Sequence, residues 1–267
     1  MRKKTANDVV GQGGVDSPSY ITNSQNNAVA GIPNKRGLNL PEYMAIDSVN
    51  HKLFVSDYSN QRVLVFNLDT NNDPIDRVAD YVLGQPNLDT GGPALTAGGL
   101  GGPHGIVVDT INNRLFVADT GYNRVLVYNI ESINNGEDAV SVLGQANFVT
   151  SDATTTQVGL SGPAGLTYNS ASNTLFVADA NNQRIMIFDV ATIADGEPAI
   201  NVLGQSDFIS SVATTTQSGL NGPNGVTFNS LSSTLFVADY NNHRIMVFNV
   251  ATIADGEPAI NVLGQSD

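Results

Sequence analysis

Four pairs of oppositely charged residues recur along the chain, each with an arginine five residues after an aspartate. The pairs are Asp57 and Arg62, Asp119 and Arg124, Asp179 and Arg184, and Asp239 and Arg244. A ring of four carboxylates could bind a cation. An arginine built in beside each aspartate instead favours a charge-assisted hydrogen bond within every pair. We therefore expect these eight residues to be structural and not catalytic.

One histidine stands at a position where the repeated segments differ. His104 lies in the segment G-P-H-G, and the equivalent residues of the other copies are Glu42, Ala164 and Asn224. Imidazole, carboxylate and amide groups bind organic ligands, and they also coordinate metals when several meet at matched geometry. We expect Glu42, His104 and Asn224 to bind a ligand. We expect no resident cofactor, and a divalent cation is the alternative.

A polar segment near residue 70 begins like a calcium-binding loop. It reads Asp69-Thr70-Asn71-Asn72-Asp73-Pro74, and Asp80 occupies the twelfth position. An EF-hand loop requires glycine at its sixth position and prefers glutamate at its twelfth. Because Pro74 occupies the sixth position here, a solvated polar loop is the expected structure.

Several catalytic chemistries lack their residues in this sequence. The chain has no cysteine, which excludes thiolate nucleophiles, disulfides and zinc–thiolate sites. Neither a G-x-S-x-G motif nor a phosphate-binding P-loop occurs. The glycine-rich run at 98–102 precedes a predicted strand and lacks the following Lys-Ser/Thr. No nucleophile and base are recognisable, so catalysis is not the function that the motifs favour.

The charged pairs belong to a long repeat. The motif V-L-G-Q begins at Val82, Val142, Val202 and Val262, at intervals of 60 residues. The motif L-F-V-x-D ends at each aspartate of the four pairs. Residues 190–207 recur without change at 250–267. Repetition at a fixed period is typical of a fold built from one unit that stacks on its neighbours.

Each repeat predicts four short strands. In the second copy they cover residues 105–109, 115–118, 124–129 and 139–143, all rich in apolar and β-branched residues and bounded by turn residues. Several are apolar on both faces, as expected when four-stranded sheets stack face to face in a β-propeller. The fold class is therefore all-β, with four-stranded antiparallel blades.

The repeated residues resemble those of a known family. The pattern G-P-x-G, L-F-V-A-D-x-x-N-x-R and V-L-G-Q is similar to the NHL-repeat β-propeller family, in the long-repeat form seen in bacterial proteins. The resemblance implies a propeller whose first strands line a central channel. Family members include interaction scaffolds, sensor domains, RNA binders and one lyase-type enzyme domain. That enzyme type uses several channel histidines around a metal, whereas the corresponding place here offers His104.

The number of blades raises a question about the ring. We expect one domain over 1–267, with blades at about 37–85, 98–145, 158–205 and 218–265, preceded in 1–36 by a strand-like segment at Val9–Gln12 and a loop. The family usually closes six blades, and the fourth copy already has its own last strand, so the N-terminal strand has no partner. We expect a fragment of a six-bladed ring, and a closed four-bladed ring is the alternative.

Charge and hydropathy limit the partners. The net charge is −13 and no lysine follows Lys52, which argues against nucleic-acid binding because that requires free basic side chains. No apolar run approaches the roughly 18 residues of a membrane-spanning helix. The basic start at residues 1–5 is not followed by the apolar core of a signal peptide. The compartment stays open, with the acidic, lysine-poor composition favouring an extracellular or cell-surface location.

The variable parts of the repeat predict the working face. The long loops that enter each blade differ in sequence, and the turns at the same end of the blades carry Tyr58, Tyr122 and Tyr240. Exposed tyrosines beside variable loops on a rigid scaffold are typical of a recognition surface, and simple solvated looping is the alternative.

Three functional hypotheses follow. The first is a non-catalytic scaffold that binds a protein, peptide or glycan through the loop face. The second is a channel-site enzyme, either a metal-dependent lyase or a lactonase-like hydrolase, which would use His104 and Glu42. The third is a purely structural repeat array of a surface protein. In each case we expect function where the copies disagree.

Overall fold

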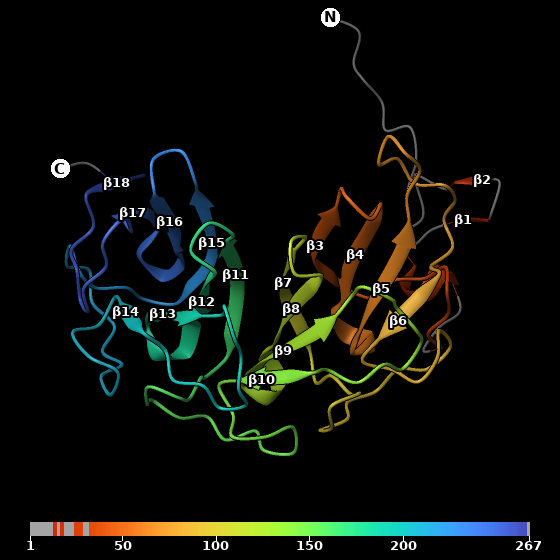
Figure 1. Cartoon of the computed structure of the whole chain (residues 1–267), viewed down its shortest axis with the longest axis horizontal. Coiled ribbons are helices and arrows are strands. Elements are labelled where there is room, and N and C mark those ends of the chain that lie inside the picture. Colours follow the sequence, from red (N-terminus) through yellow and green to blue (C-terminus); the bar gives the residue numbers. More distant parts are fainter. Residues whose placement is uncertain (1–12, 15–16, 19–23, 29–31, 266–267) are drawn as a thin grey trace, which may run out of the picture.

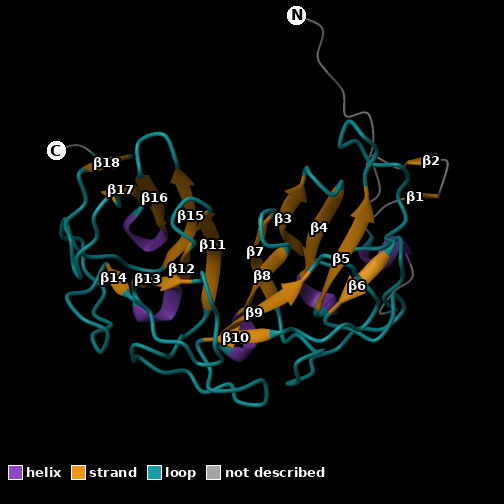
Figure 2. Cartoon of the chain, in the orientation of Figure 1, coloured by secondary structure: helices purple, strands orange, loops and turns teal. Residues whose placement is uncertain are grey.

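The computed structural model describes residues 13–14, 17–18, 24–28 and 32–265. Within these residues the chain forms four antiparallel sheets of four strands each, and every sheet is one repeat unit. The sheets lie side by side in an arc (Figures 1 and 2). The predicted all-β fold with four-stranded antiparallel blades is confirmed. The predicted strand at Val9–Gln12 lies outside the described residues.

The strands of each blade follow one another in space as in sequence. The first blade comprises β3 (Pro41–Asp47), β4 (Lys52–Asp57), β5 (Arg62–Asn67) and β6 (Tyr81–Leu83). The second comprises β7 (Pro103–Asp109), β8 (Arg114–Asp119), β9 (Arg124–Asn129) and β10 (Ser141–Leu143). The third comprises β11 (Pro163–Asn169), β12 (Thr174–Asp179), β13 (Arg184–Asp189) and β14 (Asn201–Leu203). The fourth comprises β15 (Pro223–Asn229), β16 (Thr234–Asp239), β17 (Arg244–Asn249) and β18 (Asn261–Leu263).

Short elements precede the first blade. They are the two-residue strands β1 (Gly13–Gly14) and β2 (Ser17–Pro18) and the 3-10 helix η1 (Gln25–Ala28). Within η1, Asn26 is buried and its side chain accepts a hydrogen bond from Asn60 Nδ2 at 2.7 Å. This contact fixes η1 on the first blade.

The turn between the second and third strands of each blade is a single 3-10 turn, which the sequence did not predict. These turns are η2 (Tyr58–Asn60), η3 (Thr120–Tyr122), η4 (Ala180–Asn182) and η5 (Tyr240–Asn242). The next residue adopts a left-handed conformation, with φ between 50° and 56° at Gln61, Asn123, Gln183 and His243. That conformation lets the third strand begin directly at the arginine of the repeated pair.

The hydrophobic core lies between neighbouring blades. Phe116 and Val127 of the second blade pack with Leu175 and Met186 of the third, and all four are at most 1% exposed. The other two interfaces repeat this arrangement. Because each blade buries apolar side chains on both faces, its strands read as apolar runs and not as an alternating pattern.

The inner strands β3, β7, β11 and β15 contact one another in sequence order. Two glycines permit the close approach. A Cβ atom on Gly105 would clash with the carbonyl oxygen of Ala164, and a Cβ atom on Gly165 would clash with that of Asn224. The glycine of the repeated G-P-x-G segment is therefore a packing requirement at these two blade interfaces.

The repeated Asp–Arg pairs join the loops at one end of the blades. Asp119 Oδ2 accepts a hydrogen bond from Arg124 Nε at 2.8 Å, and Asp119 Oδ1 accepts one from the Gly101 amide at 2.7 Å. Burial raises the pKa of Asp119, while the Arg124 guanidinium and nearby N–H groups oppose that rise. The carboxylate therefore depends on its arginine for compensation of a buried charge.

The arginine also holds the loops on either side of its blade. Arg124 Nη2 donates to the Gly99 carbonyl at 2.9 Å, in the loop that enters the blade. Its Nη1 donates to the Phe148 carbonyl at 2.7 Å, in the loop that leaves it. The arginines of the first three blades are fully buried, whereas the side chain of Arg244 is 11% exposed.

We predict that Arg184→Met lowers the free energy of unfolding by about 3–5 kcal/mol, because it leaves the Asp179 carboxylate buried without its partner. Arg244→Met is the matched control. It makes the same change where the guanidinium is partly solvated, so its effect should be smaller. Urea denaturation measures both. If the two variants lower the free energy of unfolding equally, burial of the pair does not set the size of the loss.

A second prediction concerns the inner strands. Gly165→Ala should destabilise the protein by about 1–3 kcal/mol, because the added methyl group forces β11 away from β15. Gly225→Ala should change stability little, since its Cβ would meet its nearest neighbours at 3.7 and 3.8 Å. Thermal unfolding of the two variants provides the comparison, and a loss of stability in Gly225→Ala alone would refute it.

Candidate functional site at the channel mouth

The four positions that vary between copies lie at the start of the inner strands, directly after a proline. In each blade the register of the first two strands shifts just beyond this proline, as in the shift between Pro103 and Ile106. Such an irregularity re-aims side chains and is common beside binding sites. The repeat thus presents one variable side chain per blade at the same level of the channel, which we call the channel mouth.

The structure brings Glu42 and His104 together. Glu42 Oε2 lies 3.8 Å from His104 Nε2. The Tyr58 ring meets the His104 ring edge-on, with centroids 6.4 Å apart. Three residues predicted to bind a ligand therefore form one cluster, drawn from β3, β7 and η2.

Tyr43 belongs to the same cluster, and the sequence patterns did not point to it. Its ring lies 5.0 Å from the His104 ring, measured between centroids. Its hydroxyl lies 3.3 Å from Asn224 Oδ1 and donates a hydrogen bond to it, so it joins the first blade to the fourth. Tyr43 takes the place of a glycine that stands in the other three copies. That break in the repeat was the signal that could have identified it.

The equivalent residue of the third blade adds no functional group to this cluster. Ala164 is 5% exposed, and its carbonyl oxygen lies against Gly105. The channel mouth is thus formed by Glu42, Tyr43, Tyr58, His104 and Asn224.

Burial sets the protonation states at the channel mouth. Desolvation lowers the pKa of His104 below its usual 6.5, and the negative charge of Glu42 opposes the shift. Desolvation raises the pKa of Tyr43, and the negative charge of Glu42 raises it further. At neutral pH the cluster therefore presents a neutral imidazole and a protonated phenol. His104 Nδ1 is buried and has no hydrogen-bond partner among the described residues.

The other two predicted tyrosines do not join this cluster. The Arg124 guanidinium lies over the Tyr122 ring at 5.3 Å from its centroid, and the same ring packs against Gly101. Tyr240 is 69% exposed. The expectation of exposed tyrosines fits Tyr240, but Tyr58 and Tyr122 are half-buried because both pack beside the loop that enters the second blade, Tyr58 at Gly102 and Tyr122 at Gly101.

The segment at Asp69 uses its carboxylate for its own backbone. Asp69 Oδ1 accepts hydrogen bonds from the amides of Asn71 and Asp73 at 2.8 and 3.0 Å, and these bonds lower its pKa. Asp80 instead accepts from the Asn67 amide at 2.7 Å. Over the part of the chain that the structure describes, no group of three or more His, Asp or Glu side chains is placed to hold a metal ion.

A family model described as the teneurin NHL domain matches residues 34–266. NHL repeat-containing protein 2 of chicken is 29% identical over 151 residues, covering 52% of this chain and 19% of that protein. The human protein of that name is 33% identical over 94 residues, covering 34% of this chain and 12% of that protein. The Arabidopsis thaliana protein SUPPRESSOR OF QUENCHING 1, chloroplastic, is 30% identical over 158 residues, covering 59% and 14%. The chain thus spans less than a fifth of these curated relatives.

Solved structures share the fold. A chain of the nidogen/laminin complex superposes with a TM-score of 0.54 at 20% identity, covering 85% of this chain and 65% of that one. Hydrazine synthase of Kuenenia stuttgartiensis gives 0.53 at 14% identity, covering 88% and 51%. At these identities the likeness concerns the propeller fold alone. The described residues include no helix of a length and hydropathy suited to crossing a membrane.

We predict that protonation of His104 destabilises the folded protein. Its pKa is lower folded than unfolded, so the unfolded chain binds the proton first as the pH falls below about 6.5. The free energy of unfolding should decrease through that range and stop decreasing below the folded pKa. His104→Gln should remove this part of the pH dependence, and His243→Gln, at an exposed turn, should retain it. Urea denaturation between about pH 5 and 8 tests the difference.

Proposed function

Because the chain belongs to the NHL-repeat family, whose model covers residues 34–266, we propose that it is a non-catalytic binding domain that recognises a protein segment at the channel mouth. NHL β-propeller domains generally mediate protein interactions. The geometry of the site supports the same class of function.

One observation carries this proposal, namely the unpaired Nδ1 of His104. A buried polar atom without a hydrogen bond costs about 1–3 kcal/mol, which a ligand that bonds it would recover. The His104 side chain is 17% exposed and that of Glu42 is 41% exposed, so a ligand would reach the carboxylate and one edge of the imidazole, and the buried Nδ1 would become accessible when the ring turns. A polar group of the ligand would pair with His104, while Glu42 would favour a neutral or positively charged group.

The composition of the channel mouth also fits recognition. Tyr43 and Tyr58 supply aromatic surface together with hydroxyl groups, and tyrosine is enriched at the energetic centres of protein interfaces. Asn224 and Glu42 add amide and carboxylate groups around them. We infer a peptide segment as the ligand, because a peptide offers both apolar side chains for the tyrosine rings and backbone or side-chain polar groups for the imidazole, carboxylate and amide.

An enzymatic role is the second candidate, and the adjacency of His104 and Glu42 favours it. A histidine and a carboxylate 3.8 Å apart would move a proton through one water, or directly if substrate binding draws them together, as a lactonase-like hydrolase would require. The metal-dependent lyase needs more ligands than the described residues place beside His104. Loss of ester or lactone hydrolysis in Glu42→Gln, with unchanged folding, would favour the hydrolase over the binding domain.

Selection from a random-peptide display library tests the binding proposal. Peptides selected on the wild-type protein should bind His104→Ala at least about tenfold more weakly, because about 1.4 kcal/mol of hydrogen bonding is lost. His243→Gln is the matched control, since it removes a histidine that lies at a surface turn, and its binding should equal that of the wild type. Equal binding by His104→Ala would refute the site. If no peptide is selected and the protein binds to a glycan array, the ligand is a glycan and not a peptide.

A further inference from the structure

The channel mouth presents more hydrogen-bond acceptors than donors. The Tyr43 hydroxyl donates its hydrogen to Asn224 Oδ1 at 3.3 Å, which leaves the lone pairs of the Tyr43 oxygen unused. The Asn224 oxygen keeps a second lone pair. The ionised carboxylate of Glu42 only accepts hydrogen bonds, so both of its oxygens add to the acceptors. A ligand rich in donors would satisfy this set of atoms.

The neutral imidazole of His104 adds a further acceptor. Its Nε2 faces the Glu42 carboxylate, with Oε2 3.8 Å away. The negative charge of that carboxylate favours the tautomer that carries its proton on Nε2. Nδ1 then holds a lone pair, and this atom is buried without a hydrogen-bond partner among the described residues. The group that His104 lacks is therefore a hydrogen-bond donor.

Glu42 is not neutralised by a basic side chain of its own chain. Among the residues that the structure describes, no lysine or arginine forms an ion pair with Glu42. His104 lies beside it at 3.8 Å, which is too long for a hydrogen bond. The Glu42 side chain is 41% exposed, so a cation that approaches from solvent reaches its oxygens.

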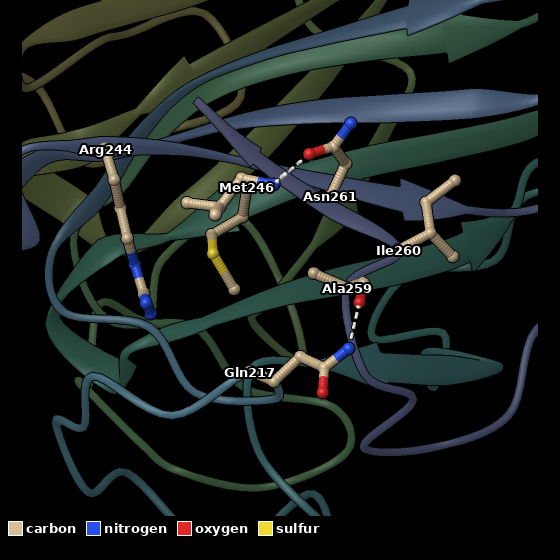
Figure 3. A pocket seen from close by; sticks show the side chains of 7 residues that line it. Gln217, Arg244, Met246, Ala259, Ile260 and Asn261 are labelled. Atoms are coloured by element: carbon tan, nitrogen blue, oxygen red, sulfur yellow. Dashed lines mark hydrogen bonds between the residues drawn. The ribbon is translucent and has the colours of Figure 1, made fainter. Parts of the chain in front are cut away.

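The arginines of the last three blades are bound to aspartates of their own blades. Each pair has a nitrogen–oxygen distance of 2.6 to 2.8 Å, in Arg114–Asp109, Arg124–Asp119, Arg184–Asp179 and Arg244–Asp239. Arg244 lines a hollow of about 390 Å³ beside β18 (Figure 3), and its Nη atoms also bond carbonyls of the loop that enters its blade. At a net charge of −13, the chain attracts cations from solution. The cation that the channel mouth lacks would thus come from a partner.

Two tyrosine rings border the same acceptors. The centroids of the Tyr43 and Tyr58 rings lie 5.0 and 6.4 Å from that of His104. Aromatic faces attract cations, and the long apolar stems of lysine and arginine pack on aromatic rings. A basic side chain of a peptide would therefore use both the acceptors and the rings.

We propose that the ligand of the channel mouth is a peptide segment held by the cationic side chain of a lysine or an arginine, with Glu42 as the counter-charge. This inference rests on the binding function proposed above and specifies its partner. An ammonium or guanidinium group carries several donors and no acceptor, which matches a site that offers acceptors. An acidic peptide would instead bring a second negative charge to Glu42.

Three synthetic peptide libraries with acetylated N-termini test this proposal on the full chain. All three lack basic residues at their random positions, and they differ at one fixed central position, which is lysine, arginine or glutamine. We expect binders from the lysine or the arginine library. Replacement of the central residue by glutamine should weaken each of these binders by at least about tenfold. The two basic libraries together show which cation the site prefers.

Variants of the protein locate the counter-charge. Glu42→Gln should weaken the selected basic peptides by at least about tenfold and make their affinity less dependent on salt, because salt screens the attraction between charges. Glu131→Gln is the matched control. It removes the same charge from an exposed glutamate of the second blade outside the channel mouth, so binding should stay within about twofold of the wild type. Thermal unfolding checks that both variants are folded.

The results separate this inference from the function on which it rests. If the glutamine library yields binders that His104→Ala no longer binds, the binding domain stands and the cationic side chain is refuted. Equal binding of the basic peptides by Glu42→Gln and Glu131→Gln refutes Glu42 as the counter-charge. If no library yields a binder, the peptide-binding function and the cationic side chain are both refuted.

Discussion

The structure depends on a buried aspartate–arginine pair that is written once into every blade. The aspartate fixes the loop that enters the blade through an amide hydrogen bond, and in the first three blades the arginine binds carbonyls of the loops on both sides. Long irregular loops would otherwise leave backbone carbonyls unsatisfied as they pass over the blade ends. The pair therefore turns three separate segments into one rigid end. Its cost is that two charges leave water, and this explains why neither partner varies in any copy.

The same contacts explain why some positions are repeated in every blade while others vary. Residues that every copy repeats make contacts that the fold requires. Asp119 and Arg124 hold loops by hydrogen bonds, and Gly165 leaves room for a neighbouring strand. The positions free to differ are those after the proline of each inner strand, where no shared contact fixes the side chain. Glu42, His104 and Asn224 lie there. The channel mouth is therefore formed by side chains that differ between the copies, and the residues that all copies share hold those side chains in place.

The sequence predicted the blades well because the signals for them are local. Apolar runs bounded by turn residues gave the third strand of the second blade as 124–129, and β9 covers Arg124–Asn129. The last strand begins later than predicted, at Ser141, because the Ala139 amide bonds the Ala97 carbonyl of a distant loop. The hydrogen bond from the Tyr43 hydroxyl to Asn224 and the one from the Val142 amide to Asp195 were likewise not predicted. Each joins residues far apart in sequence, and their pairing follows from how the blades are placed.

The two ends of the blade array are unequal. On the first blade, Val55, Leu64 and Phe66 are buried on the outward face, whereas the fourth blade exposes Leu263. In a stack where each unit is stabilised mainly by its neighbours, the unit with the smaller shared surface opens at the lowest free energy. In this 267-residue chain, unfolding should then begin at the fourth blade and proceed toward the first. The midpoint of a denaturation curve would then average over partly unfolded forms, and proteases would cleave the fourth blade before the others.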